Sequence, residues 1–242
     1  LTSIDNSRYT NFSVGMFKNT GLTSLTYYAD RIPDNCFSNC NNLESVVIAN
    51  PVVYVGASSF KNCANLTSVI FNEGVGTEFI YQYAFDGCSK LGTVLLPDSE
   101  FIIEEYVFND CSSLTTLKFN PNTYFTNNLG SILNGCSALT TFDVADNLYY
   151  SAKDNLLLDK NEERIVLAAS GYNYGDYTIP SGIKYISNSA FSSISSLTGL
   201  TISADCLEIG VSAFENCINL TVLAAFGLSE KSVLISDFCF TF

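Results

Sequence analysis

The sequence predicts an α/β repeat fold, a curved solenoid of stacked coils with a parallel β-sheet on its concave face. Three observations predict it. A unit of roughly two dozen residues recurs along nearly the whole chain of 242 residues. Fixed positions within the unit are apolar in almost every copy. The unit ends in a short stretch of alternating character, which is typical of a strand with one buried face.

The first element of the unit is a large apolar residue that anchors each copy. Residues 60–71 and 108–119 show the frame most clearly, since both read F-x-x-C-x-x-L-x-x-[V/L]-x-F. The anchors are Phe17, Phe37, Phe60, Phe85, Phe108, Leu133, Phe191, Phe214 and Phe240. A cysteine follows the anchor in most copies, at Cys40, Cys63, Cys88, Cys111, Cys136 and Cys217. Because one coil cannot bury these residues alone, we expect the stacked coils to share a continuous core.

The last element of the unit is the stretch L-x-x-V-x-I, in which alternate residues face opposite sides of a strand. Strands of successive coils are expected to pair in parallel, about 4.8 Å apart. The anchor segment that connects them, such as residues 84–90, carries Gly and Ser. This composition suits a tight turn or a single helical turn.

A longer pattern spans the unit and reads I-P-x-x-V-x-x-I-x-x-x-A-F-x-x-C-x-x-L-x-x-V-x-[I/L]. Residues 179–191 carry its first half, and residues 209–220 carry the alanine, the anchor, the cysteine and the leucine. The pattern resembles the BspA-type leucine-rich repeats of anaerobic bacteria and some parasitic protists, and the resemblance covers essentially the whole chain. It implies a leucine-rich-repeat solenoid that serves as a surface-displayed or secreted recognition module.

The repeat is interrupted once, between Leu133 and Phe191. The extra material, at about residues 146–178, has two apolar runs around the polar turn Asp159-Lys-Asn-Glu-Glu, which predicts a β-hairpin insertion near residues 147–170. We interpret the hairpin either as a structural addition or as a lateral lip on the binding face. Residues 1–242 are expected to form a single domain, and because both ends cut through a repeat, we expect a fragment of a longer array.

Charge and composition argue against several classes of function. The net charge is −13 and the eleven basic residues are scattered, whereas nucleic-acid binding needs clusters of Lys and Arg. Membrane insertion is not expected, because no apolar run approaches the length of about 18 residues that a spanning helix needs. The chain has no histidine, which removes the Ser-His-Asp triad and the Cys-His pair.

No metal, cofactor or catalytic site is expected. Structural zinc needs closely spaced pairs of cysteine or histidine, and the chain has no C-x-x-C and no histidine. No glycine-rich phosphate loop follows a strand. Six of the nine cysteines share one column, so we expect free thiols that pack inward as small apolar groups. Carboxylates such as Glu104, Glu162 and Asp143 are expected on a solvated face, at a turn and at a strand edge.

Two surfaces are candidate binding sites. The first is a strip of outward-facing strand residues, which we call the strand-face strip. It comprises Ser45, Val47, Ser68, Ile70, Thr93, Leu95, Thr116 and Lys118. Its apolar members form a candidate interface, although strand propensity and scattered surface residues also explain the pattern. The second is a tyrosine patch around the insertion, where aromatic residues suit protein or sugar contacts. It comprises Tyr149, Tyr150, Tyr172, Tyr174 and Tyr177.

The function expected from these features is binding without catalysis. The resemblance implies an adhesion or protein-binding module at the cell surface or in secreted form, with a host or microbial surface protein as its partner. A carbohydrate-binding module with a glycan ligand is one alternative, and an architectural spacer within a larger surface protein is another. An exposed tyrosine groove favours the first alternative. Solvent-like composition of every outward column favours the second.

Overall fold

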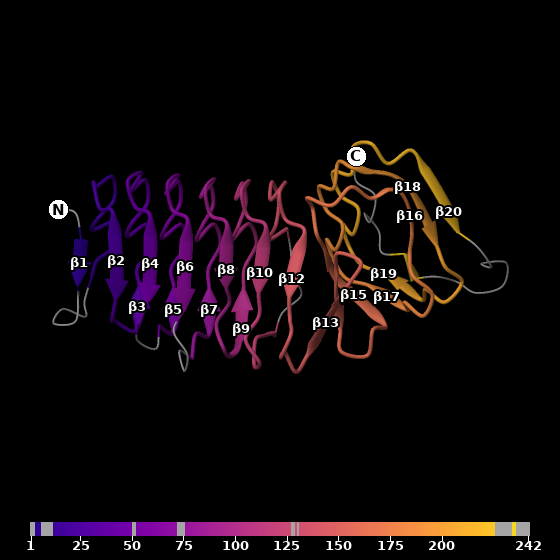
Figure 1. The fold of residues 1–242 in the computed structure, drawn as a ribbon, viewed down its shortest axis with the longest axis horizontal. Coiled ribbons are helices and arrows are strands. Elements are labelled where there is room, and N and C mark those ends of the chain that lie inside the picture. The colour runs from indigo at the N-terminus through magenta and orange to yellow at the C-terminus, as the bar shows by residue number, and fades with distance from the viewer. Residues whose placement is uncertain are drawn as a thin grey trace.

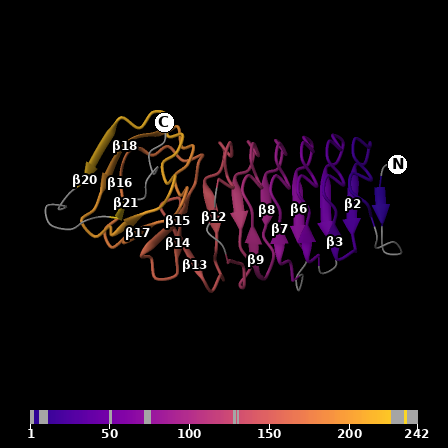
Figure 2. The same cartoon turned by 180° about the vertical axis from the view of Figure 1, so that it is seen from behind.

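The structure is a computed structural model, which describes residues 3–5, 12–49, 52–71, 76–126, 129, 131–225 and 234–235. The chain winds into coils that stack along one axis, with the N-terminus at one end of the stack (Figure 1). The coils of the N-terminal part stand in a near-straight row, and the C-terminal coils turn away from that row (Figure 2). The anchor Phe240 lies outside the described residues.

The larger sheet of the N-terminal part, called the main sheet, has seven parallel strands. Their order is β1 (Ser3–Asp5), β2 (Ser24–Tyr27), β4 (Ser45–Ile48), β6 (Ser68–Phe71), β8 (Thr93–Leu95), β10 (Thr116–Lys118) and β12 (Thr141–Asp143). The strands pair without register shifts, so that each inward residue lies beside its equivalent in the next coil. The residues of this inward column are Leu25, Val46, Val69, Val94, Leu117 and Phe142, all of them buried.

A second sheet forms another side of the same coils. Its parallel strands are β3 (Arg31–Ile32), β5 (Tyr54–Val55), β7 (Phe79–Ile80), β9 (Glu100–Ile103) and β11 (Tyr124–Phe125). The inward residues Ile32, Val55, Ile80 and Ile103 are buried. No strand was predicted at these positions from the sequence.

The α/β class expected from the sequence is corrected, because the described residues contain no α-helix. The anchor segments are turns. In the coil of Phe60, Ser58 and Asn62 have φ angles of 54° and 58°. L-amino acids tolerate this left-handed conformation as single residues and not as helices. Two such residues within one short segment prevent a helical turn, and the molecule is therefore a β-solenoid.

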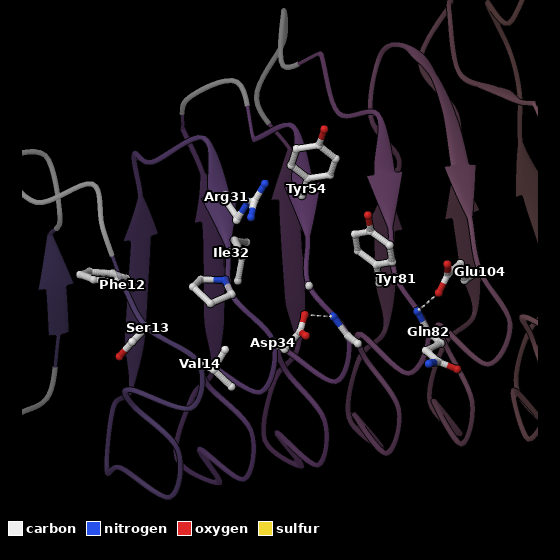
Figure 3. Close-up of a pocket in the computed structure, with 13 residues that line it drawn as sticks. Phe12, Ser13, Val14, Arg31, Ile32, Asp34, Tyr54, Tyr81, Gln82 and Glu104 are labelled. Carbon is white, nitrogen blue, oxygen red and sulfur yellow. Dashed lines mark hydrogen bonds between the residues drawn. The ribbon is translucent and has the colours of Figure 1, made fainter.

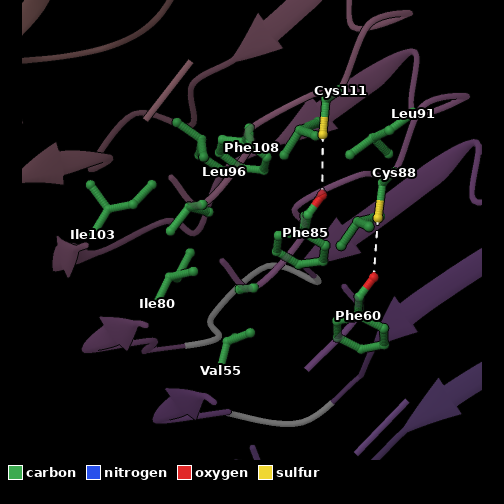
Figure 4. Packing of buried hydrophobic residues seen from close by; sticks show 14 of the residues in the cluster. Val55, Phe60, Ile80, Phe85, Cys88, Leu91, Leu96, Ile103, Phe108 and Cys111 are labelled. Atoms are coloured by element: carbon green, nitrogen blue, oxygen red, sulfur yellow. Dashed lines mark hydrogen bonds between the residues drawn. The ribbon is translucent and has the colours of Figure 1, made fainter. Parts of the chain in front are cut away.

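The core of the N-terminal coils is a stack of equivalent side chains. The rings of Phe17, Phe37, Phe60, Phe85 and Phe108 stack with centroids 5.3–5.6 Å apart. Beside them the thiols donate hydrogen bonds to the anchor carbonyl of the preceding coil (Figure 4). The eight cysteines in the described part of the chain are buried and free, which confirms the prediction for the six of the column.

The insertion forms three strands, β13 (Tyr150–Lys153), β14 (Leu156–Asp159) and β15 (Arg164–Ala168), which pair antiparallel in that order. The strand β15 then pairs in parallel with β17 (Tyr185–Ile186), which is followed by β19 (Glu208–Ile209) and β21 (Leu234–Ile235). A separate parallel sheet contains β16 (Gly175–Thr178), β18 (Leu197–Ile202) and β20 (Val222–Ala225). The main sheet therefore stops at β12, and a new one starts at β16.

The strands β14 and β15 divide the core in two. Leu157 and Leu167 belong to the hydrophobic cluster of the N-terminal coils, whereas Leu158 and Ile165 belong to the cluster of the C-terminal coils. Successive residues of a strand point to opposite faces, so both faces of this pair are buried. These two strands form an internal partition and not the lateral lip considered from the sequence.

Candidate functional site

The strand-face strip is contiguous in the structure. Pairing across β4, β6, β8 and β10 places Val47, Ile70, Leu95 and Lys118 in one row. The hydroxyl residues form the adjoining row, which comprises Ser45, Ser68, Thr93 and Thr116. All of them alternate with buried residues and therefore lie on the face away from the core. Ile70 is the most open of the apolar members, with 42% of its surface exposed.

The side chains of the row that contains Val47 change from apolar to charged along the solenoid axis. Thr26 precedes Val47 in register, and Asp143 follows Lys118. The Nζ atom of Lys118 lies 3.5 Å from Oδ2 of Asp143. Because both side chains are more than 40% exposed, this ion pair contributes at most about 1 kcal/mol. The strip thus has an apolar half over β4, β6 and β8 and a charged half over β10 and β12.

Two residues of the tyrosine patch are core residues. Tyr150 and Tyr174 have only 5% and 6% of their surface exposed to solvent. Burial raises the pKa of both phenols. The Tyr150 hydroxyl accepts a hydrogen bond from the backbone N–H of Phe125 at 3.1 Å. The Tyr174 hydroxyl accepts from the N–H of Ala169 and donates to the carbonyl of Asn155, both at 3.1 Å. Neither ring is available to a ligand.

The remaining tyrosines of the patch fall into two groups. Tyr149 is half-buried and lies 4.8 Å from Tyr124 between ring centroids, against the N-terminal core. Tyr172 and Tyr177 contact Tyr174 at 4.8 and 5.0 Å, beside the C-terminal core. The five tyrosines of the patch therefore do not form one continuous surface, because the partition of β14 and β15 divides the aromatic residues between two cores.

A groove that was not predicted from the sequence lies along the second sheet. It has a volume of about 870 Å³ and is lined by residues of β3 and β5 and by residues that follow β7 and β9 (Figure 3). Its rim includes Arg31, Tyr54, Tyr81, Asp34 and Glu104. Arg31 and Tyr54 precede the buried residues Ile32 and Val55 in short strands, so they face outward. A prediction of strands at these positions would have indicated the groove.

The buried thiols are poor nucleophiles. Burial raises the pKa of Cys63 and Cys136 to about 12 and that of Cys217 to about 11. The thiolate is the reactive form and the form that binds metals, and it is scarce at neutral pH in these groups. Within the described ranges, no group of three or more Cys, Asp or Glu side chains is placed to hold a metal ion.

The stacked coils, their parallel sheets and the repeated anchor turns define a repeat protein of the parallel β-solenoid class. A family model described as the BspA type leucine-rich repeat region matches residues 1–41, 30–155 and 169–242 with six copies. The chain belongs to this family. No curated protein sequence matches the chain. No helix among the described residues has the length and apolar character needed to cross a bilayer.

Solved structures share the fold at low identity. A leucine-rich cell surface protein from Faecalibacterium prausnitzii is 23% identical with a TM-score of 0.52, over 92% of this chain and 68% of that one. The pneumococcal vaccine antigen PcpA is 17% identical with a TM-score of 0.50, over 84% of this chain and 49% of that one. A leucine-rich repeat protein from T. pallidum is 17% identical with a TM-score of 0.50, over 82% of this chain and 78% of that one.

Proposed function

We propose that this chain is a non-catalytic protein-binding module of a cell-surface or secreted protein, and that its partner docks on the strand-face strip. The observation that carries the proposal is the unbroken row of Val47, Ile70 and Leu95 across three paired strands. Family membership supports it, as does the description of a similar structure as a cell surface protein. Adhesion to a host or microbial surface protein is the role that this placement favours.

The strip suits a protein partner better than a small ligand. Sheet strands lie about 4.8 Å apart, so the row from β4 to β10 presents a broad face instead of an enclosed cavity. Burial of Val47, Ile70 and Leu95 under a partner removes apolar surface from water, which contributes about 25 cal/mol for each Å². The adjoining hydroxyl row supplies donors and acceptors for hydrogen bonds, which give such an interface its specificity.

The two alternatives have less support in the geometry. A carbohydrate-binding module needs accessible ring faces, whereas Tyr150 and Tyr174 are buried. An architectural spacer needs no apolar row on its surface, and this chain has one at Ile70 and its neighbours. Binding to a glycan array alone, without binding to proteins, would favour the first alternative over our proposal.

The test is a binding assay with the purified chain against a panel of host matrix proteins and a glycan panel. The variant Ile70→Glu, alone and with Leu95→Glu, places charge in the apolar half of the strip, and we expect a loss of partner affinity of at least about tenfold. Ser137→Glu adds the same charge on an exposed anchor turn and should leave affinity unchanged. Circular dichroism checks that each variant is folded. Full affinity in the folded double variant would refute the strip as the binding site.

A further inference from the structure

The groove on the second sheet is a site distinct from the strand-face strip. We propose that it binds an extended peptide segment with two basic side chains two residues apart, lying along the solenoid axis. The proposal is independent of the function assigned to the strip. It stands on the shape of the groove, on its uncompensated carboxylates and on the distance between them.

The shape of the groove comes from small residues between larger ones. Gly56 and Ala57 line it with little or no side chain, while Tyr54 and Tyr81 project beside them (Figure 3). Gly56 lies so near the preceding coil that an added Cβ would be 2.6 Å from the backbone N of Asp34. At Gly56 the groove is therefore lined by backbone, which leaves room for an extended chain.

The charge of the groove is negative. Asp34 and Glu104 each use one carboxylate oxygen to accept a backbone N–H, from Ala57 at 2.9 Å and from Gln82 at 3.0 Å. Among the described residues, the ion pairs of the molecule involve other carboxylates, and neither Asp34 nor Glu104 has a cation within 4 Å. Among the described residues that line the groove, Arg31 is the one with a positive charge. The groove thus complements a cationic ligand, in a chain whose net charge is −13.

The charge of Asp34 is not needed for its structural role. In the C-terminal coils Asn188 occupies the corresponding place, and its Oδ1 accepts the N–H of Val211 at 2.9 Å. The neighbouring Gly210 makes the same close approach, since an added Cβ would lie 2.5 Å from Asn188. A neutral amide therefore supports this turn as well as a carboxylate does. The negative charge of Asp34 is therefore available to interact with a ligand.

The separation of the carboxylates selects the ligand. Asp34 follows β3 and Glu104 follows β9, with β5 and β7 between them. The two carboxylates reach toward each other, because Asp34 accepts the N–H of Ala57 and Glu104 accepts the N–H of Gln82. These N–H groups hold equivalent positions of adjacent coils, one strand step of about 4.8 Å apart, so the accepting oxygens lie at most about 11 Å apart. An extended chain advances about 3.4 Å per residue and alternates faces, so side chains two residues apart lie on one face about 7 Å apart. Two basic side chains at that spacing reach both carboxylates.

One tyrosine of the groove already contacts a cation, and a second one is left for a ligand. The guanidinium carbon of Arg31 lies 4.9 Å from the ring centroid of Tyr54, an arrangement in which the ring quadrupole attracts the charge. Tyr81 lines the same groove. It offers its ring edge and hydroxyl to the hydrocarbon stem and the charged head of an incoming Lys or Arg.

The experiment measures binding of labelled seven-residue peptides by fluorescence anisotropy. The probe peptide has lysines at its second and fourth positions, with Ser, Thr and Ala elsewhere and blocked ends. The control peptide has the same composition with lysines at the second and third positions, which point to opposite faces of an extended chain. We expect the probe to bind about tenfold more tightly than the control peptide. Equal binding of the two peptides would overturn the proposal.

Matched variants separate the groove from general attraction to an acidic protein. Asp34→Asn with Glu104→Gln keeps both acceptors and removes both charges, and should weaken probe binding about tenfold. Glu44→Gln with Asp146→Asn removes the same charge from exposed positions outside the groove and should change it by less than about twofold. Equal losses in the two variants would overturn the site. Ile70→Glu should leave probe binding intact, so that failure of the strip and failure of the groove are distinguishable.

Discussion

The thiol of Cys63 donates a hydrogen bond to the carbonyl oxygen of Phe37, one coil earlier, at 3.2 Å. The same carbonyl also accepts the backbone N–H of Cys40 within its own coil, at 3.2 Å. Cys88, Cys111, Cys136 and Cys217 make the equivalent bond to the preceding anchor at 3.0–3.3 Å. The cysteine column therefore links the coils as well as filling space between them.

The first prediction concerns this link. Cys88→Ala removes a buried donor and its sulfur, and should lower the free energy of unfolding by about 1–2 kcal/mol. Urea denaturation measures the change. Cys206→Ala is the control, because Cys206 is buried outside the column and its sulfur is 3.7 Å from its acceptor. An equal loss in both variants would show that the thiol contributes only volume.

The second prediction concerns alkaline pH. Burial raises the pKa of Cys63 and Cys136 from 9.0 to about 12. Their contribution to stability is complete below the unfolded pKa, and it is lost as the pH rises from about 9 towards 12, because only the unfolded chain then releases the protons. We expect the free energy of unfolding to fall by at least about 1 kcal/mol between pH 8 and pH 10. Cys63→Ala with Cys136→Ala should reduce this fall, and a pH-independent stability would contradict the prediction.

The third prediction concerns the close approach of neighbouring coils at a glycine. An added Cβ at Gly56 would lie 2.6 Å from the carbonyl oxygen of Ile32 and from the backbone N of Asp34. Gly56→Ala should therefore destabilise the protein by about 1–3 kcal/mol. Gly92→Ala has open space around the new methyl group and serves as the control in thermal unfolding. Equal melting temperatures for the two variants would be inconsistent with the packing described.

The fourth prediction concerns the partition between the two cores. Leu157→Ala and Ile165→Ala each remove a buried side chain and should cost about 2–5 kcal/mol. Leu157 packs in the N-terminal cluster and Ile165 in the C-terminal cluster. Hydrogen exchange should therefore lose protection mainly around β10 and β12 in the first variant, and around β17 and β19 in the second. The exposed Lys153→Ala is the control. Identical exchange maps for the two core variants would rule out a divided core.

Several features could be predicted from the pattern of residues because they are decided within one repeat. The inward positions of Val46, Val69 and Val94 follow from an apolar column that recurs in every unit. The free, buried state of Cys63 and its equivalents follows from one cysteine per coil. The outward row of the strand-face strip follows from alternation along a strand, and pairing in register then makes it contiguous.

Other features depend on contacts between distant segments. The anchor turn of Phe60 is not helical, because Ser58 and Asn62 adopt left-handed conformations. The residue types of this short segment are compatible with a helical turn as well, so the sequence does not decide between the two. The groove depends on the positions of Tyr54 in β5 and of Tyr81, which directly follows β7. Their positions come from strand pairing between coils, and this pairing joins residues far apart in the chain.

The sequence by itself determined that this chain is a stack of repeated coils with apolar residues and thiols inside, because the repetition of one unit leaves each coil with a buried face that only its neighbours can cover. Only the tertiary structure decided that β14 and β15 of the insertion lie between two cores. Leu157 and Leu158 are adjacent apolar residues, and the chain alone does not show that one faces each core. That assignment depends on which coils pack against β14 and β15, and packing between segments distant in sequence is decided by the whole fold.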